Sequence, residues 1–154
     1  MTGSDATEAL VKFCGNPWRF QQTFETPLGN LRPFVKAIVS ATELVQAASL
    51  TIDEVVFEPE GLIKLLKSYS IPPNLERGFS LTATGQREVE ELLRVVLSEW
   101  IDFLFIPESQ SFAVYADHDE FTTLYAHTRA NLDRIAGALL NQGFKVAENY
   151  ERRF

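Results

Sequence analysis

The chain has very few sulfur-containing residues. Among its 154 residues there is one cysteine, Cys14, and one methionine, Met1. A single cysteine cannot form an internal disulfide or a zinc cluster built from cysteines. Because disulfides belong to oxidising compartments, we expect a cytoplasmic protein held together by its hydrophobic core.

Long hydrophobic runs are also missing. No stretch reaches the roughly 18 uninterrupted apolar residues that a membrane-spanning helix needs. The first residues carry neither the basic region nor the apolar region of a secretory signal peptide. We therefore expect no association with a membrane.

Positive charge is scarce relative to negative charge. The 14 Lys and Arg residues face 21 Asp and Glu residues, which gives a net charge of −7 and a pI near 4.8. This is the wrong sign for a protein that binds phosphates by counterion release. The composition therefore argues against direct nucleic-acid binding and favours a basic protein as partner.

The common catalytic signatures are absent as well. The sequence contains no Gly-x-Ser-x-Gly elbow, no P-loop, no Gly-x-Gly-x-x-Gly turn and no His-Glu-x-x-His helix. These absences weaken the case for nucleophile-elbow hydrolases, P-loop enzymes, dinucleotide binders and zincins. We expect a protein without a cofactor, and binding is favoured over catalysis.

What the sequence does contain is enough apolar surface for one core. Hydrophobic residues make up 45% of the chain and charged residues 23%, and phenylalanine occurs 12 times. There is no internal repeat and no long Pro/Gly/Ser linker. The chain is therefore interpreted as one domain over residues 1–154, with residues 1–8 as a flexible terminus.

The first half of the chain predicts short elements. Phe20–Phe24 is predicted to be a strand, and Phe34–Val39 a second strand because its residues are β-branched or aromatic. A short helix is expected over Ala41–Leu50. Val55–Phe57 is predicted as a buried strand, and Leu62–Leu66 as a two-turn helix.

The strongest helix prediction begins near Thr84, a residue type favoured at the N-cap. Three glutamates follow close to the positive end of the expected helix dipole. The apolar residues then recur with helical spacing at Val89, Leu92, Leu93, Val96, Leu97 and Trp100. One face of this helix should be buried.

Three apolar runs separated by short polar gaps follow, at Trp100–Ile106, Phe112–Ala116 and Phe121–Ala126. This spacing is typical of hairpins and predicts an antiparallel meander. A second helix is predicted from a Thr128 cap to Gly143, followed by a strand at 144–146. The order of elements predicts an α+β fold: a mostly antiparallel sheet with helices packed on one face.

The densest polar cluster is Asp117, His118, Asp119 and Glu120, between two predicted strands. Carboxylates with an imidazole are suitable ligands for a divalent ion. A hairpin turn explains the same residues, because aspartate side chains bond the local backbone. Along a strand alternate side chains point to opposite faces, so the turn is favoured and we expect no metal here.

Two isolated residues have possible chemistry. Imidazole is the side chain best suited to act as a base near neutral pH, so His127 could do so, but a histidine before a helix is more often bonded to backbone. Cys14 could be a nucleophile beside a cation such as Arg19. Its neighbours Phe13 and Trp18 favour a packing role instead.

A second acidic cluster comprises Asp53, Glu54, Glu58 and Glu60. Paired carboxylates can hydrolyse glycosides when they face each other across a substrate. Acids at strand ends also protect a sheet edge, and this interpretation is preferred. No role is assigned to the segment Tyr150–Phe154.

The charge is concentrated in one part of the sequence. Between Glu88 and Glu120 there are nine acids against Arg94 alone, a local charge of −8, so the rest of the chain carries +1. A solvated helix face and turns would also explain this run. The predicted partner-binding residues are Glu90, Glu91, Asp117, His118, Asp119 and Glu120.

These features predict an acidic protein-binding module. Its expected form is an inhibitor, antitoxin or immunity-type protein that covers a basic partner, with electrostatic steering setting the association rate. The alternative is a small metal-dependent hydrolase that uses Asp117, His118 and Asp119 with His127. A third possibility is a subunit of a larger assembly with exposed aromatic residues at its interface.

Overall fold

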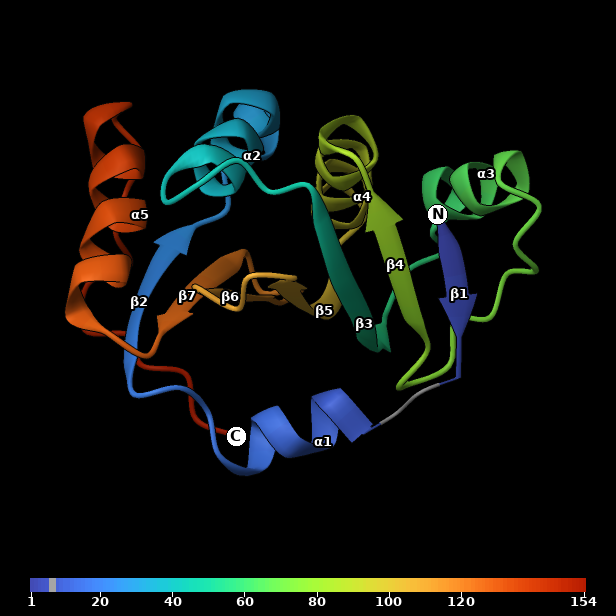
Figure 1. Ribbon diagram of the computed structural model, residues 1–154, viewed down its shortest axis with the longest axis horizontal. Helices are drawn as coiled ribbons and strands as arrows, with labels where there is room; N and C mark the ends of the chain where they lie inside the picture. Colours follow the sequence, from blue (N-terminus) through green and yellow to red (C-terminus); the bar gives the residue numbers. More distant parts are fainter. Residues whose placement is uncertain (6–7) are drawn as a thin grey trace.

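A computed structural model describes residues 1–5 and 8–154. Its seven strands form one antiparallel sheet in the order β1-β4-β3-β5-β6-β7-β2 (Figure 1). The strands are β1 (Thr2–Ser4), β2 (Phe20–Glu25), β3 (Ala47–Val55), β4 (Ser80–Thr84), β5 (Ile101–Pro107), β6 (Ala113–Ala116) and β7 (Phe121–Ala126). The predicted α+β fold with an antiparallel sheet is confirmed.

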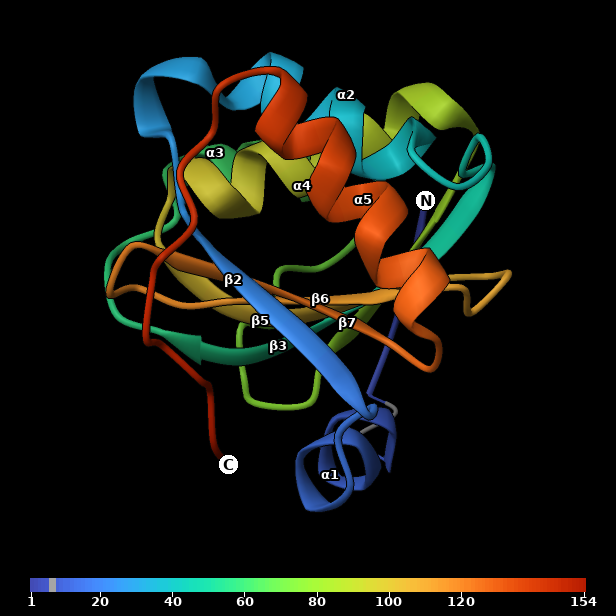
Figure 2. The same ribbon diagram turned by 90° about the vertical axis from the view of Figure 1, so that its left-hand side faces the viewer.

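Most of the helices pack on one face of this sheet. They are α1 (Glu8–Gly15), α2 (Leu31–Ser40), α3 (Glu60–Ser68), α4 (Gln86–Ser98) and α5 (Arg129–Asn141), with a short 3₁₀ helix η1 (Leu28–Asn30) before α2. Figure 2 shows α2, α4 and α5 above the sheet. In the described part of the chain, no helix is long and apolar enough to cross a bilayer.

The apolar core between these helices and the sheet matches the predicted helix faces. Six residues that the helical spacing assigns to the buried faces of α4 and α5 are all at most 3% exposed: Leu93, Val96, Leu97, Leu132, Ile135 and Leu139. Leu140, which the same spacing assigns to the buried face of α5, is 49% exposed. Facing the six buried residues from the sheet are Phe103 and Phe105 of β5 and Leu124 of β7. The helical spacing of the sequence therefore identified the main core correctly.

The predicted meander is confirmed in β5, β6 and β7, with Phe103 opposite Ala116 and Ala116 opposite Thr122. Trp100 does not extend α4 as expected. The helix ends at Ser98, and Trp100 has φ 59° in the turn that leads into β5. Trp100 therefore belongs to the connecting turn, outside both the helix and the strand.

The prediction for residues 31–50 is reversed in the structure. Residues 31–40 form helix α2, where a strand over Phe34–Val39 was expected, and β3 begins at Ala47, within the expected helix. In α2 the apolar residues lie on one stripe that packs against α4 and α5. Burial of that stripe outweighs the weak strand preference of β-branched residues.

Three smaller predictions also differ. The structure pairs Thr2–Ser4 with β4, where a flexible terminus was expected. The expected strand Val55–Phe57 ends at Val55, and both Val56 and Phe57 are exposed. The expected strand at 144–146 is reduced to one bridge between Val146 and Phe24.

The helix caps were only partly predictable. The Thr128 hydroxyl accepts a hydrogen bond from the Asn131 amide, as expected for the cap of α5. Gly143 has φ 85°, which explains a glycine just past the helix end. Thr84 instead ends β4, and the N-cap of α4 is Gly85 with φ 92°.

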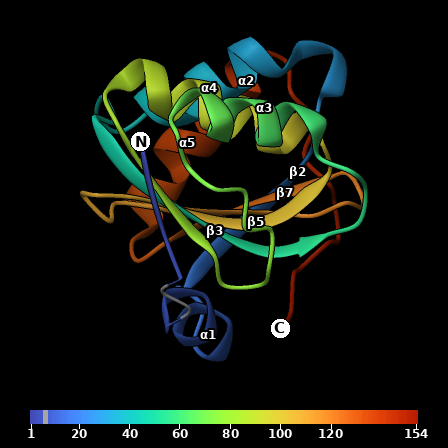
Figure 3. The same cartoon turned by 90° about the vertical axis from the view of Figure 1, so that its right-hand side faces the viewer.

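The opposite face of the sheet is covered by α1 and by the C-terminal segment (Figure 3). A smaller cluster lies there, with Phe13 of α1 against Leu104, Tyr115 and Tyr125 of the sheet. The helices are thus not confined to one face. This second face carries Asp117, one of the polar residues that the sequence marked as candidates, whereas Glu90 and Glu91 lie on α4.

Candidate functional site

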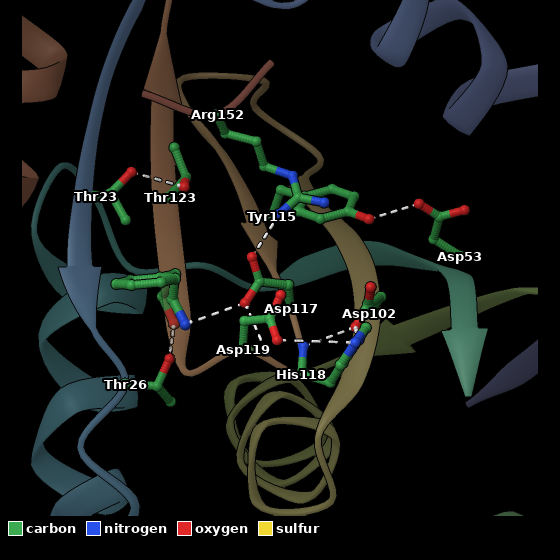
Figure 4. Close-up of polar contacts among 12 residues, drawn as sticks. Thr23, Thr26, Asp53, Asp102, Tyr115, Asp117, His118, Asp119, Thr123 and Arg152 are labelled. Carbon is green, nitrogen blue, oxygen red and sulfur yellow. Dashed lines mark hydrogen bonds and ion pairs between the residues drawn. The ribbon is translucent and has the colours of Figure 1, made fainter. Parts of the chain in front are cut away.

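Asp117 is a structural residue of the β6–β7 hairpin. Its Oδ1 accepts hydrogen bonds from the amides of Asp119 (3.0 Å) and Phe121 (3.1 Å), and its Oδ2 forms an ion pair with Arg152 (Figure 4). The residue is only 6% exposed. Asp117 therefore orders the turn, and its buried carboxylate offers little surface to the partner that was predicted for it.

His118 is oriented by a buried carboxylate. Asp102 Oδ1 lies 2.8 Å from both the His118 backbone nitrogen and Nδ1 (Figure 4). The hydrogen bond to Asp102 raises the pKa of His118, and burial raises the pKa of Asp102. Since Nδ1 is engaged, Nε2 is the nitrogen left to face outward, 3.9 Å from Asp119 Oδ1.

Glu54 joins this pair. One ligand atom from each of Glu54, Asp102 and His118 lies within 4.8 Å of the others, the one group of this kind in residues 1–5 and 8–154. Two carboxylates and an imidazole suit Zn²⁺ or Mn²⁺. The predicted set is not formed, because this group contains neither Asp117 nor Asp119.

His127 is remote from this group. It follows the last residue of β7, whereas His118 precedes the first, and a six-residue strand spans roughly 20 Å. Its ring stacks on Trp18 with centroids 4.1 Å apart. The hydrolase alternative in its predicted form therefore lacks its second histidine.

A second polar network crosses the same face of the sheet. The Tyr115 hydroxyl donates to Asp53 Oδ2, and Arg77 Nε bonds Asp53 Oδ1 at 2.6 Å. The Arg152 guanidinium lies over the Tyr115 ring, 4.0 Å from its centroid (Figure 4). Burial is the main cause of the raised pKa of Tyr115, so its hydroxyl remains a hydrogen-bond donor.

Cys14 packs beside this network against the smaller apolar cluster. Burial, and then the negative charge of Asp53, raise the pKa of the Cys14 thiol. A raised pKa reduces the thiolate fraction, and the thiolate is the nucleophile. The packing interpretation of Cys14 is therefore the better supported one.

Strand pairing gathers exposed acids at one end of the sheet. Glu54 at the end of β3 lies opposite Asp102 at the start of β5, and Glu25 at the end of β2 lies opposite Phe121. The β6–β7 hairpin lies between them in the sheet order. We call the exposed residues of this region the acidic end: Glu25, Glu54, Asp119 and Glu120.

The arginines closest to this region are already paired. Arg152 binds Asp117, Arg77 binds Asp53, and Arg153 lies 3.6 Å from Glu151. Phe57, just beyond β3, is 58% exposed. Among the described residues no arginine forms an ion pair with the acidic end, where Asp119 lies 3.9 Å from His118 Nε2. The acidic end thus combines carboxylates with an exposed aromatic side chain.

Glu90 and Glu91 lie elsewhere, in a groove between α2 and α4. Four cations share this groove with them: Arg32, Lys36, Arg87 and Arg94. Their positive charges reduce the negative potential around both glutamates. The acid-rich run of the sequence is therefore divided in space between a mixed-charge groove and the acidic end.

The sequence did not reveal which distant residues meet in this site, although Glu54 was named there as part of a separate acidic cluster. Glu54, Asp102 and Arg152 belong to segments that only the sheet and the C-terminal segment bring together. The acids on either side of residues 55–57 were visible in the sequence. The strand that pairs with this segment was not predictable. No protein-family model, no curated protein and no solved structure matches the chain.

Proposed function

We propose that this chain is a protein-binding module whose acidic end docks on a basic protein, in the manner of an inhibitor, antitoxin or immunity protein. The observation that carries the proposal is the convergence of Glu25, Glu54, Asp119 and Glu120 at one end of the sheet. The protein would work in the cytoplasm, where its one cysteine stays reduced.

The rigidity of the hairpin supports this proposal. The side chain of Asp117 ties down the backbone of Asp119 and Phe121, and the Thr26 amide bonds the Glu120 carbonyl at 2.8 Å. A surface that is already ordered loses less entropy on binding. Phe57 adds an apolar anchor of the type found at interface centres.

The expected energetics are those of a steered complex. Exposed charges accelerate encounter with an oppositely charged surface. They are screened over a Debye length of about 8 Å at physiological ionic strength. Association should therefore slow steeply with added salt, while dissociation changes less.

The test compares two ends of the same sheet. The partner is captured from a lysate of the producing cells at low salt, identified, purified, and its association measured by surface plasmon resonance. The variant Asp119→Lys/Glu120→Lys should associate at least tenfold more slowly. The matched control is Glu43→Lys/Glu108→Lys, on exposed loops where β3 begins and β5 ends.

Glu25 cannot serve as a control for the charge reversal at the hairpin. It lies far from the hairpin in sequence but beside it in the sheet. It pairs with Phe121 beside the hairpin, so its reversal should also slow association. Equal effects of the two reversals, or association that is indifferent to salt, would contradict the proposed function.

One observation favours a second function, metal-dependent hydrolysis. The group Glu54, Asp102 and His118 offers three ligands and leaves positions for water. Calorimetry with Zn²⁺ and Mn²⁺ tests it directly. Tight, stoichiometric binding that His118→Ala abolishes would favour the hydrolase, and its absence would favour the binding module.

A further inference from the structure

A pocket of about 760 Å³ lies at the other end of β7 from the acidic end. It is formed by α1, by the loop that leads into β2, and by residues at the far ends of β5 and β7. Its volume falls in the range of small-molecule sites, about 300–1,000 Å³. The side chains of Phe13 and Ile106 give it apolar lining.

An aromatic stack forms one wall of this pocket. The rings of Trp18 and His127 are nearly parallel, at 29°, with centroids 4.1 Å apart, and the Phe13 ring meets Trp18 edge-on. Trp18 is half-buried and His127 is exposed. A planar ligand ring can therefore reach the stack from solvent, and such stacking does not depend on the identity of the ring.

The charge of the lining is opposite to that of the chain. Lys12 and Arg19 both line the pocket, and none of the carboxylates in residues 1–5 and 8–154 does, although the chain contains 21 acids. Across the described residues neither cation forms an ion pair. The Arg19 guanidinium lies 4.9 Å from the Phe20 ring centroid, which restrains its position.

We propose that this pocket binds a small aromatic anion, a planar ring that carries a phosphate or a carboxylate. The ligand ring extends the existing Trp18–His127 stack on its outer face, and the anionic group is held by Lys12 and Arg19. This site is independent of the acidic end. The proposed binding module would then bind a small molecule as well as a protein partner.

Tryptophan fluorescence reports on the pocket directly. The chain has two tryptophans, Trp18 and Trp100, so Trp100→Phe leaves Trp18 as the sole reporter. Four probes separate the two parts of the ligand: AMP and nicotinate carry ring and anion, adenosine only the ring, and inorganic phosphate only the anion. Amide shifts in the unaltered chain provide the same titration without a substitution.

We expect saturable quenching by AMP or nicotinate with a Kd at or below about 1 mM. Adenosine and phosphate should bind at least tenfold more weakly. Phenyl phosphate and benzoate, which carry the same ring, then identify phosphate or carboxylate as the preferred group. Equal binding of adenosine and AMP, or no saturation by either anionic probe up to about 10 mM, would overturn the proposal.

Substitutions place the binding in this pocket. Lys12→Ala/Arg19→Ala should weaken binding of the better probe at least tenfold, because both cations are removed from exposed positions. The matched control, Lys36→Ala/Arg94→Ala in the groove between α2 and α4, should leave the affinity unchanged. Unchanged affinity in the pocket variant would contradict the site, whatever the outcome at the acidic end.

Discussion

The two faces of the sheet are stabilised in different ways. On the helix-covered face, β5 contributes Phe103 and Phe105 to a continuous apolar core. On the opposite face, the same strand contributes Asp102 and Leu104, and the covering segments bring both apolar and charged groups. Alternate residues of one strand thus serve two environments.

This difference shows how a buried face tolerates polar groups. Thr23 and Thr123 bond each other at 2.8 Å, and Asp117 is matched by Arg152 and two backbone amides. Buried polar groups cost little when they are paired and several kcal/mol, roughly, when they are not. The second face is therefore sensitive to the loss of one partner, and the first to the loss of volume.

The largest effect is expected on the helix-covered face. Leu93→Ala or Leu139→Ala should lower the free energy of unfolding by about 2–5 kcal/mol, because each leaves a cavity in the core. Denaturant titration measures this. Leu140→Ala is the matched control, since Leu140 is 49% exposed on the same helix as Leu139. Similar losses of unfolding free energy in Leu139→Ala and Leu140→Ala would mean that the buried face of α5 is wrongly assigned.

On the second face the main effect should come from the buried ion pair. Arg152→Met should cost about 1.5–3 kcal/mol of unfolding free energy, because it leaves the Asp117 charge without its cation. Adding Asp117→Asn should recover part of this loss, as shown by a double-mutant cycle. The neighbouring Arg153→Met should change little, because Arg153 and Glu151 are both exposed.

A smaller effect is expected at the threonine pair. Thr23→Val alone should destabilise the protein by about 1–2 kcal/mol, because it leaves the buried Thr123 hydroxyl without its partner. The double variant Thr23→Val/Thr123→Val should be close to wild type, since both polar groups are then gone. A double variant less stable than the single one would show that the hydroxyls have other roles.

The smallest effect is a pH dependence at His118. The hydrogen bond to Asp102 is the main reason that the pKa of His118 is raised in the folded state. The protonated His118 therefore stabilises the fold fully below the unfolded-state pKa of about 6.5. This stabilisation is lost as the pH rises through the folded-state pKa. Asp102, whose pKa is raised by burial, acts in the same direction.

The stability difference between wild type and His118→Gln should therefore shrink from about pH 5.5 to about pH 8.5. Unfolding free energies at several pH values measure it. His127→Gln is the control, because His127 stacks on Trp18 and has no carboxylate partner in the described residues. A difference that grows with pH would contradict the Asp102–His118 contact.

Long sequence patterns predicted the elements of this fold better than short ones. The helices around Leu93 and Leu139 were predictable because each repeats its apolar residues over three turns. The meander was predictable from its short polar gaps. The segment 31–50 failed because its apolar residues are also β-branched or aromatic, so strand and helix patterns overlap within one short run.

The sequence by itself determined the α+β class, the main core, the two long helices and the hairpin turn at Asp117–Glu120, because these depend on neighbours within about four residues. Only the tertiary structure decided which charges meet. Strand pairing brought Glu54 to Asp102 and His118, the C-terminal segment brought Arg152 to Asp117, and Trp18 met His127 across 109 positions. Such contacts depend on the order of the strands in the sheet and on the path of the chain between elements. Local side-chain preferences do not encode either of these.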